Sequence, residues 1–211
     1  MQISAEIRWF WPREAPAGLQ EWFTSASAHR CPAGGGQPRV DAYLRDPAQR
    51  ELGIKLREGK GVEVKGLITV LWTTLSADPF VGPIEIWAKW NSKALSLNET
   101  MTLKTTKTRW LRKFDTAGAD AREIPLDAKE QPAAGASLPT LGCNVELTRV
   151  EVDAETWWTL SFEAFGKPTT VENDLRASAA ALAARRPPSL GTGSVESYAA
   201  WLSRYQTPAQ V

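Results

Sequence analysis

The sequence predicts an α+β fold that is mainly β, with about eight antiparallel strands followed by helices. Apolar and polar residues alternate in most runs between residues 5 and 166, which is the pattern of strands with two different faces. After Gly166 the pattern changes to an Ala-rich stretch with spaced polar residues, which is typical of an amphipathic helix. An antiparallel sheet of this length tends to close into a barrel or to split into two sheets.

The expected strands follow one another along the chain. The first, at residues 5–11, is stopped by Pro12, and a short helix is expected within 14–26 before a loop rich in Gly and Pro at 29–38. The second strand is expected at 39–44, and the third and fourth form a pair at 52–67 around a tight Glu58-Gly59-Lys60-Gly61 turn, with 66–75 continuing the fourth. Further strands are expected at 82–91 and at 101–115. A closing hairpin is expected at 143–166, with its turn near 153–156. Residues 116–139 are expected to form a loop, because they are rich in Ala, Gly, Pro and Asp.

The C-terminal part is expected to be helical. Residues 171–186 predict a helix ended by Pro187 and Pro188, and residues 194–205 predict a second short helix capped by Ser194. We interpret residues 1–211 as one domain, with 167–211 as its C-terminal helical segment.

Composition excludes several classes of function. The net charge is +1, so there is no overall attraction to nucleic acid or to an anionic membrane, and neither is expected as a partner. The chain begins without a basic-then-apolar leader and has no apolar run of membrane-spanning length, so a cytoplasmic location is expected. His29, Cys31 and Cys143 have no zinc-site spacing, and two separate thiols are favoured over a disulfide.

Nearly every expected strand has an ionisable face and an apolar face. The ionisable faces hold five glutamates and seven basic residues: Glu6, Glu63, Glu85, Glu146, Glu163, Arg8, Lys55, Arg57, Lys65, Lys89, Lys107 and Arg109. The common interpretation is a wetted outer face of mixed charge. If helices cover the outside of a barrel, these faces instead line a wet interior. There Arg and Lys could bind phosphoryl oxygens, carboxylates could hold Mg²⁺ or Mn²⁺, or the charges could pair internally.

Several runs resemble, in order and spacing, the CYTH domain proteins, or triphosphate tunnel metalloenzymes. EIRWF lies where that family has its Glu-x-Glu-x-Lys hallmark, and RVDAYL is similar to the strand that follows. LGIKLREGKGVEVKG resembles the basic strand, turn and lysine strand, IEIWAKW the middle acidic strand, and KTRWLRKF the Lys-x-Arg strand. NVELTRVEVDAETWWTLSFEAFG resembles the closing hairpin, and SVESYAAWL resembles a common ending, so the resemblance spans roughly residues 5–205.

This resemblance implies a closed eight-stranded antiparallel β-barrel around a charged tunnel, with flanking and C-terminal helices. It implies Mg²⁺ or Mn²⁺ as the cofactor and a small anionic phosphorylated ligand. The positions that match the family's phosphate-binding residues are Lys55, Arg57, Lys65, Lys107 and Arg109. The positions that match its metal-binding residues are Glu6, Glu85, Glu146 and Glu163.

The chain departs from the family pattern mainly at the metal-binding positions. Arg8 replaces the second hallmark glutamate and Phe10 replaces the hallmark lysine. Thr148, two residues after Glu146 on the same face, carries no carboxylate, and Glu163 also lacks a second carboxylate beside it. Metal sites of this kind need clustered carboxylates. Arg8 places a fixed positive charge where a metal would sit, so we count it among the phosphate-binding residues.

Three hypotheses follow for function. The favoured one is a tunnel protein that binds a phosphorylated or polyphosphate anion, with a degenerate metal site and weak or no catalysis. The alternative is a metal-dependent hydrolase of inorganic, nucleoside or thiamine triphosphate. The third is a Trp-rich β protein without a tunnel, acting as an interaction module; the ten Trp residues are dispersed, however, which favours core packing. Trp87 could stack on a base, although packing inside the barrel is the expected role.

Overall fold

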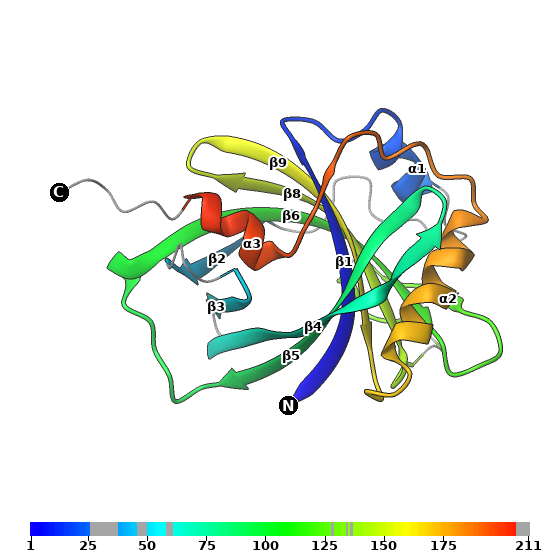
Figure 1. Cartoon of the computed structure of the whole chain (residues 1–211), viewed down its shortest axis with the longest axis horizontal. Helices are drawn as coiled ribbons and strands as arrows, with labels where there is room; N and C mark the ends of the chain where they lie inside the picture. Colours follow the sequence, from blue (N-terminus) through cyan, green and yellow to red (C-terminus); the bar gives the residue numbers. More distant parts are fainter. Residues whose placement is uncertain are drawn as a thin grey trace.

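Eight antiparallel strands close into a barrel in the computed structural model (Figure 1). The structure describes residues 1–25, 38–45, 50–57, 61–127, 129–133, 135 and 137–205. The barrel strands are β1 (Gln2–Pro12), β2 (Arg39–Leu44), β3 (Leu52–Arg57), β4 (Gly61–Ala77), β5 (Phe80–Ser92), β6 (Thr102–Asp115), β8 (Gly142–Val152) and β9 (Glu155–Phe165). Their order around the barrel is β1-β5-β4-β3-β2-β6-β8-β9, and β9 pairs again with β1 over the whole of Ser4–Pro12. The predicted closed barrel is confirmed.

Two short strands complete the sheet. β7 (Arg122–Ile124) lies within the predicted loop and pairs with the end of β6. β10 (Ser194–Val195) pairs with Trp9 and Phe10 of β1. Because β5 pairs with β1 only up to Glu6, β10 covers the part of the β1 edge that β5 leaves open.

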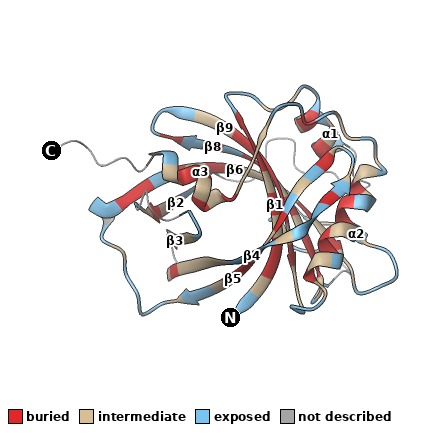
Figure 2. Ribbon diagram, viewed as in Figure 1, coloured by how far each residue is buried: buried red, intermediate tan, exposed pale blue. Residues whose placement is uncertain are grey.

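Helices cover the apolar outer faces of the strands on one side of the barrel. α1 (Leu19–Ser25) and α2 (Val171–Ala183) pack against outward side chains of β1, β8 and β9, where Figure 2 shows buried residues. Fully burying one such Leu, Ile or Phe contributes about 1.5–3 kcal/mol. The larger core cluster is formed by Ile7, Trp9, Phe23, Val145, Leu147, Leu160, Phe162, Leu175 and Leu182, among others. This covering turns the opposite, charged faces of the same strands inwards.

The C-terminal helix α3 (Tyr198–Leu202) fills one end of the barrel, followed by the 3-10 turn η2 (Ser203–Tyr205). The predicted cap at Ser194 is wrong, because Ser194 and Val195 extend along β1 as β10. The helix begins later, and Ser197 caps it by accepting a hydrogen bond from the Ala200 amide at 3.0 Å. Trp201 of α3 is fully buried against the inner face of the barrel.

Other predicted boundaries differ by a few residues. α2 ends at Ala183 rather than residue 186, since Arg186 adopts a left-handed φ of 53° immediately before Pro187. β1 begins at Gln2, β4 does continue through the predicted 66–75 extension, and β8 and β9 join at Asp153–Ala154 as predicted. The remaining element, η1 (Glu99–Met101), precedes β6. His29, Cys31 and the turn residues 58–60 lie outside the described residues.

No helix within the described ranges has both the length and the apolar character needed to cross a bilayer.

Candidate functional site

The barrel encloses a cavity of about 440 Å³ that is rich in charged side chains. Among the residues that the structure describes, nine basic and four acidic side chains line it: Arg8, Arg39, Lys55, Arg57, Lys65, Lys89, Lys107, Arg109, Lys113, Glu6, Glu63, Glu146 and Glu163. All six residues predicted to bind phosphate are among them, as are three of the four predicted metal ligands. Glu85 is the exception and does not line the cavity. Since Lys55, Arg57, Lys107 and Arg109 face this interior, the expectation of an open sheet without a tunnel is wrong, whereas an interaction role of the Trp residues stays a prediction.

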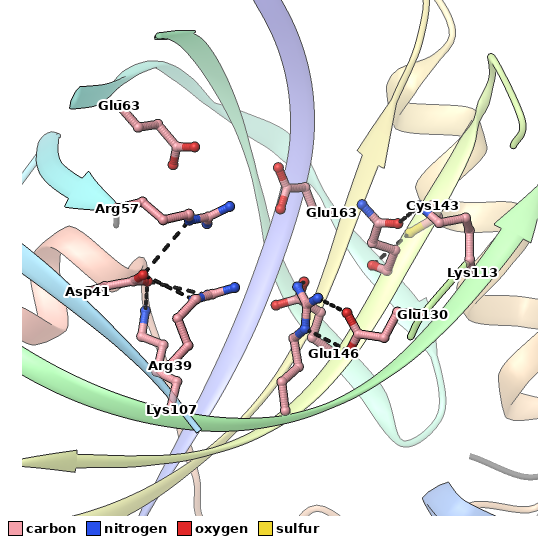
Figure 3. Close-up of polar contacts among 12 residues, drawn as sticks. Arg39, Asp41, Arg57, Glu63, Lys107, Lys113, Glu130, Cys143, Glu146 and Glu163 are labelled. Carbon is pink, nitrogen blue, oxygen red and sulfur yellow. Dashed lines mark hydrogen bonds and ion pairs between the residues drawn. The ribbon is translucent and has the colours of Figure 1, made fainter. Parts of the chain in front are cut away.

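Asp41 of β2 is the buried anion of a basic cluster on one side of the cavity (Figure 3). Its carboxylate lies 3.2 Å from Lys107 Nζ, 3.0 Å from Arg39 Nε and 3.8 Å from Arg57 Nε. Burial alone would raise the pKa of Asp41, but the surrounding cations hold that pKa well below its usual range. Asp41 therefore fixes where these cations lie, with Arg39 and Arg57 extending towards the middle of the barrel in Figure 3.

Lys107 of β6 is the most enclosed cation of this cluster. Its Nζ donates a hydrogen bond to Tyr43 Oη at 2.6 Å and lies 3.9 Å from the ring centroid of Tyr198. Burial lowers the pKa of the Lys107 ammonium well below its usual range, although Asp41 opposes this shift. Lys107 thus has protein partners on several sides, and its predicted role in binding phosphate stays a prediction.

A chain of ion pairs crosses the opposite side of the cavity. Lys65 pairs with Glu6 and lies 3.9 Å from Glu163, which in turn lies 3.1 Å from Lys89. Lys55 pairs with Glu63 at 2.8 Å. Burial would raise the pKa of Glu163, but Lys65 and Lys89 lower it well below its usual range. Lysines therefore compensate the charges of these carboxylates, and the lowered pKa values of Glu63 and Glu163 keep those two ionised.

Arg109 of β6 binds two carboxylates at once. Its Nη1 donates to Glu146 Oε1 at 2.7 Å, and its Nε and Nη2 donate to the two carboxylate oxygens of Glu130. Glu146 in particular, together with Glu130, raises the pKa of the Arg109 guanidinium. Glu130 is not on a strand and belongs to the loop between β7 and β8.

Each carboxylate predicted to hold a metal has a partner within the protein. Glu6, Glu146 and Glu163 each face a cation of the protein, namely Lys65, Arg109 and Lys89 in that order. Glu85 instead accepts a hydrogen bond from Trp87 Nε1 at 2.9 Å, and burial raises its pKa. Among the residues the structure describes, no group of three or more His, Cys, Asp or Glu is arranged to hold a metal ion. These contacts favour charge compensation within the protein, and a divalent metal at these positions stays a prediction.

Arg8 and Lys113 are the cavity cations that lack a carboxylate partner in the described part of the chain. Arg8 Nη1 donates to Thr159 Oγ1 at 3.2 Å, and its guanidinium lies 5.3 Å from the Tyr198 ring centroid. Lys113 Nζ donates to Asn144 Oδ1 and lies over the ring of Phe165. Their charges are solvated by neutral groups, so they remain available to an anion.

Sequence reasoning missed several residues of this site. Arg39, Asp41 and Tyr43 alternate along β2, and Lys113 shares the inward face of Lys107 and Arg109, so the same alternation could have found them. Glu130 lies in a loop without periodicity and gave no signal. Two predicted inward residues are accounted for by packing: Phe10 stacks on Trp201, and Trp87 is 2 % exposed beneath Lys65.

Comparisons with known proteins add little to this geometry. No family model matches the chain. No curated protein sequence matches it either. Among solved structures, the RNA triphosphatase Pct1 of S. pombe matches with a TM-score of 0.41 and 12 % identity, over 87 % of this chain and 77 % of that chain. At this level of similarity the match does not bear on what the chain binds.

Proposed function

We propose that the barrel interior binds a small, highly charged phosphorylated anion without a divalent metal, and that the chain has weak or no catalytic activity. The observation that carries this proposal is the excess of cations over carboxylates among the described residues of the cavity lining, nine against four. An excess of nine against six remains when Asp41 and Glu130, which pair with lining cations from behind the lining, are counted, in a chain whose net charge is only +1. An enclosed site with a surplus of positive charge attracts a polyanion more strongly than an exposed surface of the same charge.

Arg8 has the central role in this proposal. It stands where the resemblance to triphosphate tunnel metalloenzymes places a metal-binding glutamate, and it has no carboxylate of its own among the described residues. A guanidinium is always charged and presents several N–H donors to phosphate oxygens. Arg8 would therefore supply at this position the positive charge that a metal supplies in that family.

The position of α3 at one end of the barrel supports one direction of entry for the ligand. Residues 197–199 before and within α3 line the cavity near Phe10, at one end of β1, whereas Gln2 and Phe165 line it at the other end. We expect the phosphoryl groups to enter from the Gln2 end and to reach Arg8, Arg39 and Arg57 inside. Any organic group would remain near Phe165, Leu138 and Pro139.

The proposal is tested by separating binding from turnover. Unfolding is followed with tripolyphosphate, ATP or thiamine triphosphate in EDTA, where a binder at about 100 times its Kd gains about 2.7 kcal/mol of stability. Phosphate release is measured with malachite green in Mg²⁺ or Mn²⁺. Metal-free stabilisation without release supports the proposal. Metal-dependent release that is lost in Glu163→Gln would instead establish the triphosphate hydrolase.

A further inference from the structure

The two carboxylates on Arg109 have different origins. Glu146 lies on β8, which pairs directly with β6, so the sheet itself holds Glu146 beside Arg109. Glu130 reaches the same guanidinium from the loop between β7 and β8 and occupies its Nε and Nη2 donors as a fork. That two-oxygen geometry is also the one in which Arg binds a phosphoryl group. Glu130 thus occupies the donors that a ligand phosphate would use.

The loop holds Glu130 in place through its own hydrogen bonds. Asp127 Oδ1 accepts from the amides of Lys129 and Gln131 at 2.8 and 2.9 Å, and the Asp127 amide donates to the Gln131 carbonyl at 2.7 Å. Glu130 itself has a left-handed φ of 59°, and Leu126 forms a bridge with Pro132. These contacts accompany the approach of the Glu130 side chain to Arg109. Figure 3 shows Glu130 close to Glu146, the other carboxylate on Arg109.

Glu130 is also the carboxylate that can leave. Its side chain is 27 % exposed, against 18 % for Glu146, so water can solvate it on release at lower cost. It does not line the cavity, whereas Leu138 and Pro139, later in the same connection, do. The connection that carries Glu130 therefore reaches the cavity without being part of the barrel wall.

We propose that Glu130 is a built-in competitor of the ligand: it holds Arg109 in the empty tunnel, and a phosphoryl group must displace it to bind Arg109. This inference rests on the proposed anion-binding function and adds the residue that sets its affinity. The site would therefore prefer anions with enough charge to replace the Glu130 carboxylate on Arg109. Binding of such an anion would release the loop between β7 and β8 that carries Glu130.

The test compares tripolyphosphate binding to the wild type and to Glu130→Gln by calorimetry in EDTA. In the wild type, the ligand must break the charge-assisted contact between Glu130 and Arg109 before it can bind Arg109. Glu130→Gln weakens that contact, so the variant is expected to bind tripolyphosphate about tenfold more tightly. Glu151→Gln is the matched control, since this substitution removes the same charge from an exposed ion pair with Arg149 outside the cavity. The control is expected to leave the affinity unchanged, and the gain is expected to vanish in Arg109→Ala/Glu130→Gln relative to Arg109→Ala.

Hydrogen exchange gives a second readout that needs no variant. Saturating tripolyphosphate is expected to speed exchange at the Lys129 and Gln131 amides of the wild type, because the turn loses its anchor on Arg109. Equal or weaker binding by Glu130→Gln, or unchanged exchange in a wild type that binds, would overturn the competitor role while leaving the anion-binding function intact. Failure of both the wild type and the variant to bind tripolyphosphate would overturn the proposed function itself.

Discussion

Phe10 stacks on Trp201, with ring centroids 4.8 Å apart and ring planes 9° from parallel. Phe10 shares the inward face of β1 with Glu6 and Arg8, so the barrel interior changes from charged to apolar along a single strand. The apolar end holds α3 through Phe10, Tyr43, Leu103, Val150 and Val152. The position where the family pattern has a lysine is thus used here to seat the C-terminal helix, and α3 bounds the charged cavity at this end.

Removing Trp201 should destabilise the protein far more than removing another Trp. Trp201→Ala is expected to lower the free energy of unfolding by about 3–5 kcal/mol, because it empties a fully buried site packed on Phe10. Trp72 is the matched control, since its side chain is fully exposed and its replacement by Ala should change stability by less than about 0.5 kcal/mol. Urea unfolding measures both changes in stability, and equal effects would contradict the packing role assigned to Trp201.

The buried carboxylate of Asp41 predicts a fall in stability in acid. Its folded-state pKa is lowered by its cationic neighbours, so its contribution is complete above the unfolded value of about 3.9 and is lost as pH falls below it. Free energies of unfolding measured between pH 6 and pH 3 should decline with pH. Asp41→Asn should weaken that decline and, at pH 7, cost about 3–5 kcal/mol by leaving Lys107 without its carboxylate. A decline of unchanged slope in the variant would contradict this assignment.

Arg8 should matter for binding more than for folding. Arg8→Gln is expected to weaken tripolyphosphate binding about tenfold in EDTA, because it removes a charge-assisted donor pair while leaving a polar group for Thr159. Arg149→Gln removes the same charge outside the cavity and should leave the affinity within about twofold. If the two variants weaken binding equally, the effect is one of net charge, and Arg8 has no special place in the site.

Alternation along the strands could predict most of the barrel and much of its lining. The i, i+2 spacing of Lys55 and Arg57, and of Lys107 and Arg109, places each pair on one face, and the structure turns those faces inwards. Alternation assigns a face but cannot say where along the interior the chemistry changes. Phe10 follows the same alternation as Arg8 and yet packs against α3, because Trp201, which lies 191 residues further along the chain, stacks on it.

The pairing of charges could not be predicted from sequence. Whether Glu163 binds a metal or Lys89 depends on which strands lie opposite each other, and the β1–β5–β4 register brings lysines to the glutamates. Glu130 could not be predicted at all, because its approach to Arg109 depends on the path of a loop rather than on any repeat. The cap of α3 was misassigned for a related reason: Ser194 and Ser197 are equivalent as caps by residue type, and only pairing with β1 separates them.

The most direct test of metal-free anion binding is a calorimetric titration of tripolyphosphate into the wild-type protein after exhaustive treatment with EDTA. The cation surplus of the cavity predicts saturable binding at one site per chain under these conditions, with an affinity that falls as salt is raised. Absence of binding in EDTA, followed by binding and phosphate release once Mn²⁺ is added, would contradict it.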